Sequence, residues 1–196
     1  MLPIIAQLRA AATMMAMASP APVPVGLMVE AALPVDVSLY DGNLQTSAEV
    51  AIMRDGSTDE ATAKEIRHLF RDRAGRERKI NQRTLALLAD ISERYGKPVE
   101  FVSVFRGGDE GGSPHLAGRA IDFRVKGVKL TDIRDYLWSH YEEVGVGWYP
   151  NESFIHIDSR TGENACAWTF YNGDNHYHPY WAEVARQPKQ DHKPGV

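Results

Sequence analysis

Two histidines and one aspartate occupy positions in the sequence that suit a metal site. Asp122 lies in the stretch 120–125 and His156 in the stretch 153–159, and both stretches alternate apolar and polar residues as half-buried strands do. Because strand side chains repeat every two residues, Asp122 and His156 each face away from their apolar neighbours. His115 precedes the first of these strands. Two imidazoles and one carboxylate on neighbouring strands form a zinc ligand set of the catalytic kind, which leaves a fourth position open for water.

Three segments carry a resemblance to a known family: Ser113-x-His115-x-x-Gly118-x-Ala120-x-Asp122, Gly145-Val-Gly-Trp-Tyr-Pro150 and Phe154-Ile-His-Ile-Asp158. From about Val35 to Trp168, the chain resembles the zinc D-alanyl-D-alanine carboxypeptidase and murein endopeptidase family, which shares its zinc site with the hedgehog signalling domain. It is most similar to the branch of small periplasmic murein endopeptidases, which cut peptidoglycan cross-links. The resemblance implies a zinc (Zn2+) cofactor held by His115, Asp122 and His156.

The residue that would accept a proton from the zinc-bound water departs from the family pattern. Many members carry Glu or Asp three positions before the second histidine, but this chain has Ser153 there. Amide hydrolysis still needs a base, and the two nearby carboxylates are Asp158 and Glu152. We expect Asp158 to be the base, because it shares a strand face with His156. The alternatives are that Glu152 is the base and that Asp158 orients a ligand imidazole.

Two residues are expected to contact the substrate. Arg106 ends a predicted strand over 98–106, and the resemblance implies that an arginine here binds a carboxylate of the substrate peptide. A guanidinium matches a carboxylate in two parallel hydrogen bonds, which lysine cannot do. The alternative is that Arg106 pairs with Asp109 or Glu110. We also expect Ser113, which opens the first motif, to contact the substrate.

Hydrophobic periodicity and capping residues predict an α+β fold. The pattern favours a small, mainly antiparallel sheet with helices packed on one side and the zinc site on the open face. A helix starting at Ser57 or Thr58 should run to about Arg73, and another, capped by Thr131 or Asp132, should follow the metal strand. The remaining predicted elements are strands over 35–40, 49–54, 98–106, 145–150 and 167–171 and a helix over 81–95.

Composition limits the classes of partner. The chain has 196 residues, a net charge of −4 and a pI near 6.0, which argues against nucleic acid because phosphate binding favours a basic face. Its hydrophobic share of 43% is sufficient for a core. The single cysteine, Cys166, cannot form an intrachain disulfide. We expect a peptidoglycan peptide as the partner and a monomer.

The two ends of the chain differ from its middle. Residues 1–34 combine a signal-like apolar segment with a proline-rich linker, residues 35–185 should form the zinc peptidase domain, and residues 186–196 a polar tail. The apolar segment is too short and too interrupted to span a bilayer, which takes about 20 apolar residues. We therefore expect a periplasmic or secreted protein of the bacterial cell envelope.

These observations support one hypothesis and two alternatives. The first is a zinc-dependent murein endopeptidase that hydrolyses peptide cross-links at a D-amino acid centre. The second is a zinc-bearing module that binds wall peptide or a protein without turnover. The third is a D-Ala-D-Ala carboxypeptidase or dipeptidase. The residues and their spacing indicate only metal-assisted hydrolysis. The substrate class is inferred from the resemblance.

Overall fold

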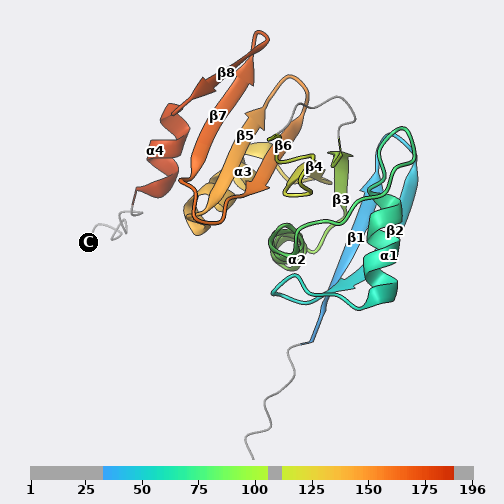
Figure 1. The fold of residues 1–196 in the computed structure, drawn as a ribbon. Helices are drawn as coiled ribbons and strands as arrows, with labels where there is room; N and C mark the ends of the chain where they lie inside the picture. The colour runs from blue at the N-terminus through green and yellow to red at the C-terminus, as the bar shows by residue number, and fades with distance from the viewer. Residues whose placement is uncertain (1–32, 106–111, 188–196) are drawn as a thin grey trace, which may run out of the picture. The chain divides into compact units, whose positions relative to one another are not determined.

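Residues 33–105 and 112–187, which the computed structural model describes, form one open β-sheet with four helices (Figure 1). The elements are β1 (Val35–Asp41), β2 (Thr46–Ile52), α1 (Glu60–Leu69), α2 (Gln82–Tyr95), β3 (Val99–Ser103), β4 (Ala120–Val125), α3 (Leu130–His140), β5 (Val144–Tyr149), β6 (Phe154–Ser159), β7 (Cys166–Tyr171), β8 (Asp174–Tyr177) and α4 (Tyr180–Arg186). The strand order is β2-β1-β3-β4-β6-β5-β7-β8. Neighbouring strands are antiparallel except β1–β3 and β5–β7. The predicted α+β class is confirmed, with a larger sheet than expected.

The sheet has an apolar face that the helices cover. Ile121 and Phe123 on β4, and Ile155 and Ile157 on β6, are buried in the core. The same core takes residues from every helix in the described part of the chain: Ile66, Leu69, Leu88, Ile91, Ile133, Leu137 and Ala182. Burying each large apolar side chain contributes about 1.5–3 kcal/mol. By the alternation of strand side chains, Asp122 therefore lies on the face opposite the helices.

Local hydrogen bonds explain the ends of α2, as predicted. The Asn81 side chain accepts a hydrogen bond from a backbone N–H of the first turn, and Gly96 ends the helix in the left-handed conformation with φ 57°. The prediction for α3 was less accurate. This helix is preceded by Lys129, which makes no side-chain capping bond, whereas Thr131 or Asp132 was expected to cap it.

The boundaries of α1 differ from the prediction at both ends. Asp59, not Ser57 or Thr58, caps the helix, because its carboxylate accepts a hydrogen bond from a backbone N–H in the first turn. The helix also ends before the predicted Arg73. There the backbone turns around the Asp72 carboxylate, which accepts hydrogen bonds from two backbone N–H groups and so replaces the helical pattern.

The C-terminal part holds two elements that were not predicted. Its sequence has no clear period, yet it forms β8, which pairs with β7, and the short helix α4. Tertiary contacts hold α4 in place: the Trp138 indole N–H donates to the Ala182 carbonyl over 2.8 Å, and the Arg186 guanidinium lies 3.7 Å from the Trp138 ring centroid.

The central strands β4 and β6 carry the candidate metal ligands. They pair in antiparallel register, and Asp122 lies directly opposite His156. Three predictions fall wholly or partly outside the described residues: the signal-like segment within 1–34, the role of Arg106, and the polar tail 186–196. None of the described helices is both long and apolar enough to cross a lipid bilayer.

Candidate metal site

Three side chains from separate parts of the chain converge on the face opposite the helices. One ligand atom from each of His115, Asp122 and His156 lies within 4.8 Å of the other two, and all three residues are buried. The Asp122 Oδ1 atom is 2.8 Å from His156 Nδ1 and 3.5 Å from His115 Nε2, and the two nitrogens are 3.2 Å apart. Tetrahedral ligands about 2.0–2.2 Å from a zinc ion lie about 3.3–3.6 Å from one another. The spacing therefore suits a single small metal ion.

In each imidazole, the ring nitrogen that points away from Asp122 lies near a hydrogen-bond acceptor. His115 Nδ1 lies 2.8 Å from the carbonyl oxygen of Val104, and His156 Nε2 lies 3.2 Å from Asp158 Oδ2. An imidazole that donates from one nitrogen presents a lone pair on the other, so these contacts suit the tautomers that would offer His115 Nε2 and His156 Nδ1 to a metal. Each contact also holds its imidazole in the orientation that turns the other nitrogen toward Asp122.

Asp158 is enclosed by its own partners. It is 1% exposed, and Arg160 donates to both of its oxygens, from Nε over 2.7 Å and from a terminal nitrogen over 3.3 Å. With His156 on Oδ2 as well, the carboxylate is held by three hydrogen bonds. This geometry suits the orienting role better than the role of base, because a base needs a lone pair directed at the water.

Both carboxylates of the site remain ionised at neutral pH. Burial alone would raise the pKa of Asp122, but hydrogen bonds from His115 and His156 outweigh it and hold that pKa well below its usual range. Burial likewise opposes ionisation of Asp158, and its hydrogen bonds with His156 and Arg160 outweigh that effect and lower its pKa. A buried carboxylate beside two imidazoles is a position that a divalent cation would stabilise.

Two glycines of β5 make room for this arrangement. Gly145 lies opposite Asp158, and a Cβ atom placed on it would be 2.0 Å from Asp158 Oδ2. A Cβ atom on Gly147 would be 2.5 Å from the Trp168 ring, whose centroid lies 5.0 Å from that of His156. Any larger residue would therefore displace either the carboxylate that holds His156 or the indole beside it.

The other predicted site residues lie in different surroundings. Ser113 is half-buried in the turn that leads to His115, and its carbonyl accepts a hydrogen bond from the Ala117 N–H over 3.3 Å. Glu152 is exposed in the turn between β5 and β6. Ser153, which replaces the family carboxylate, is exposed with a left-handed φ of 59°. Glu152 thus lies near the site in sequence, with no contact to the three converging side chains.

Two partners of the site were missed by sequence reasoning. Arg160 follows Asp158 by two positions and so shares its strand face, which is a signal that could have revealed the ion pair. The Val104 carbonyl gave no such signal, because a backbone acceptor can occur beside any residue type.

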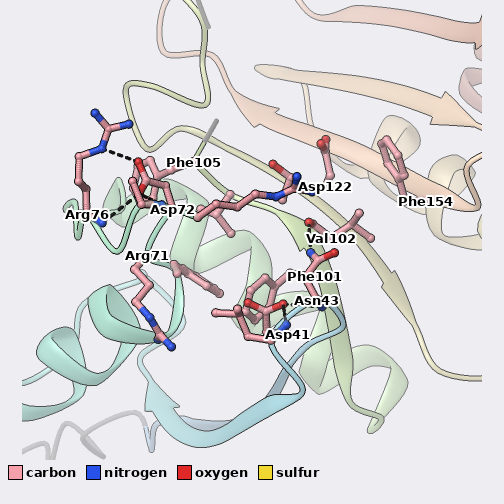
Figure 2. A pocket seen from close by; sticks show the side chains of 16 residues that line it. Asp41, Asn43, Arg71, Asp72, Arg76, Phe101, Val102, Phe105, Asp122 and Phe154 are labelled. Carbon is pink, nitrogen blue, oxygen red and sulfur yellow. Dashed lines mark hydrogen bonds and ion pairs between the residues drawn. The ribbon is translucent and has the colours of Figure 1, made fainter. Parts of the chain in front are cut away.

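A pocket of about 670 Å³ opens beside the candidate metal site. Figure 2 shows Asp122 and Phe154 at one end and Arg71 and Arg76 at the other. The loop after α1 and the end of β3 form its walls. An elongated ligand that filled the pocket would thus have one end at the three converging side chains.

Comparisons with known proteins agree with this geometry. The family model described as peptidoglycan L,D-endopeptidase MepK matches residues 29–164. Peptidoglycan L,D-endopeptidase MepK of Escherichia coli (strain K12) is 33% identical over 119 residues, covering 53% of this chain and 64% of the relative. The probable peptidoglycan L,D-endopeptidase MepK of Haemophilus influenzae is 45% identical over 47 residues, covering 24% of this chain and 25% of the relative.

The matched regions set the scope of the comparison. This chain spans less than two thirds of the length of either relative, and no solved structure is significantly similar to it. The family match, in contrast, includes all three converging side chains and the strands that carry them. Because the family model covers most of the chain, and the chain has a possible metal site of the expected composition, the chain belongs to the MepK-type branch of the M15 metallopeptidase family.

Proposed function

We propose that this protein is a zinc-dependent peptidoglycan endopeptidase that hydrolyses a peptide cross-link at a D-amino acid centre. The observation that carries the proposal is the convergence of His115, Asp122 and His156 within 4.8 Å, with an acceptor near the other ring nitrogen of each imidazole. The relatives' names supply the substrate class, since both are called peptidoglycan L,D-endopeptidases.

In this proposal the two histidines and Asp122 hold the zinc ion. When bound, zinc would supply a water with a pKa of about 7 and polarise the scissile carbonyl. The Val104 carbonyl and Asp158 keep the imidazoles in the ligand tautomer. The ionised Asp122 supplies the negative charge that makes this buried position favourable for a cation.

We assign the base to Glu152 and the orienting role to Asp158. The support for this choice is that Asp158 already takes part in three hydrogen bonds, whereas Glu152 is exposed in a turn next to β6. We retain Arg106 and Ser113 as substrate-binding residues. A cell-envelope location and a monomeric state follow as further parts of the proposal.

The test combines hydrolysis with metal dependence. Purified protein is incubated with peptidoglycan sacculi and with isolated cross-linked muropeptides, and the products are identified by mass spectrometry. We expect dimers to be split into monomers, activity to disappear with EDTA, and zinc to restore it. Trimming of single terminal residues would indicate a carboxypeptidase instead. Stoichiometric zinc with no turnover on any wall fraction would indicate a binding module and overturn the proposal.

A further inference from the structure

The pocket beside Asp122 ends in a rigid turn at the far side. Asp72, with a side chain 3% exposed, accepts hydrogen bonds from the backbone N–H groups of Ala74 and Arg76, each over 2.9 Å. Its other oxygen accepts from Arg76 Nε over 2.7 Å, and the Gly75 N–H donates to the Asp72 carbonyl over 2.8 Å. Figure 2 shows Asp72 and Arg76 joined in this way. The turn is thus fixed from within, and it carries its neighbouring side chains at defined positions.

Within the part of the chain that the structure describes, each carboxylate in the pocket wall is already engaged by other groups of the fold. Asp72 is neutralised by Arg76, and Asp122 belongs to the three converging side chains. Asp41 is 5% exposed and accepts hydrogen bonds from the backbone N–H groups of Asn43 and Leu44 over 2.7 and 3.0 Å. These carboxylates are therefore occupied by groups of the protein itself.

Two arginines in the same wall have no such commitment. Among residues 33–105 and 112–187, Arg73 makes no ion pair and no side-chain hydrogen bond, and Arg71 donates only to the carbonyl of His68, over 2.5 Å. Neither guanidinium forms an ion pair with a carboxylate of the described residues, although both line a pocket that reaches Asp122. The pocket wall beside the turn after α1 therefore carries two guanidinium groups that no carboxylate of the described residues neutralises. Guanidinium groups bind carboxylates through paired hydrogen bonds.

We propose that the pocket wall formed by the turn after α1 is a subsite for a free carboxylate of the peptide substrate, bound by Arg73 and Arg71. The inference rests on the proposed function, because it requires the scissile bond of the bound peptide to lie at the Asp122 end of the pocket. The bound carboxylate would fix which way the peptide lies in the pocket. The enzyme would then discriminate against peptides in which that carboxylate is amidated.

The test compares two substrates and four proteins. A cross-linked muropeptide and its carboxamide form are hydrolysed by the wild type, R73Q, R73K and the control K64Q, which removes an exposed charge of α1 outside the pocket. A hydrogen bond to a charged group is worth about 1.5–3 kcal/mol, which corresponds to about a 10- to 150-fold effect. We expect R73Q to lower kcat/KM on the acidic peptide by about that factor, mainly through KM, and to leave the carboxamide unaffected.

The remaining variants separate charge from packing. R73K should restore part of the affinity, and K64Q should behave as the wild type. Equal effects of R73Q on both substrates, or none on either, would refute the subsite. Binding of both peptides is measured in parallel by calorimetry. If the wild type hydrolyses neither peptide but binds the acidic one more tightly through Arg73, the subsite stands and the proposed hydrolysis fails.

Discussion

At the scale of single residues, Asp158 is where the geometry most changes the assignment of roles. Sequence position alone favoured it as the base, because it shares a strand face with His156. In the structure it accepts hydrogen bonds from His156 and Arg160 and is 1% exposed, so its lone pairs are directed at protein groups. In the proposed zinc site, Asp158 would act on the metal through the imidazole, by setting its tautomer and raising the basicity of the ligand nitrogen.

This assignment predicts different losses for two conservative variants. Asp158→Asn should weaken zinc affinity about 10- to 100-fold, as loss of an orienting partner does, and excess zinc should restore most of the activity. Glu152→Gln should retain zinc at the wild-type stoichiometry while kcat falls by about 10²- to 10⁴-fold, the range for loss of a general base. Zinc titration and steady-state kinetics measure the two effects. The reverse pattern would make Asp158 the base.

The residues of the site were predictable to different degrees. Asp122 and His156 could be found because each alternates with apolar residues on a strand, whereas His115, which lies in the turn before β4, was found through the motif that carries the resemblance. Arg106 lies outside the described residues and stays a prediction. The roles of Asp158 and Glu152 depend on which hydrogen bonds form in space, and the sequence does not contain that information.

At the scale of elements, β5 shapes the site through its two glycines, Gly145 and Gly147. Gly145→Ala would bring a methyl group to within 2.0 Å of Asp158 Oδ2, so the carboxylate must move away from His156. We expect unfolding to become about 1–3 kcal/mol easier, as for overpacking, and zinc affinity to fall as in Asp158→Asn. The matched control is Gly42→Ala, where the added Cβ meets only the end of the Glu100 side chain. Equal zinc affinity in both variants would contradict this role of β5.

The turn after α1 should control the acid sensitivity of the fold. Backbone hydrogen bonds from Arg76 lower the pKa of Asp72, and the Arg76 side chain adds to this against the effect of burial. A group with a depressed folded-state pKa stabilises the protein above its unfolded pKa, and this contribution is lost as pH falls through the folded-state value. Asp72→Asn should therefore lower Tm at neutral pH, with a difference from the wild type that shrinks toward acid pH. A constant difference from pH 7 to pH 3 would contradict this.

The ends of elements were less predictable than their existence. Asn81 and Gly96 are strong signals at an N-cap and a C-cap, and α2 was predicted correctly. Around α1 three neighbouring residues could each cap the helix, and tertiary packing decides which one does. The turn at Asp72 competes with helix continuation through its side chain, so periodicity alone extended the helix too far.

At the scale of the whole molecule, the fold class followed from sequence but the extent of the sheet did not. Alternating strands and amphipathic helices indicate an α+β fold with a two-faced sheet. The addition of β8 and α4 depends on long-range partners, such as the Trp138–Ala182 hydrogen bond, that leave no periodic trace in the sequence. The parallel β1–β3 and β5–β7 pairs are likewise set by topology.

In the proposed site, two imidazoles and a carboxylate hold one zinc ion and leave a position for water. X-ray absorption spectroscopy on the zinc-loaded protein, with metal content measured in the same sample, tests this arrangement directly. We predict one zinc per chain with only nitrogen and oxygen neighbours at about 2.0–2.2 Å, two of them imidazole, and loss of this signal in His156→Ala. A sulfur neighbour from Cys166 at about 2.3 Å, or an unchanged zinc spectrum in His156→Ala, would contradict the account.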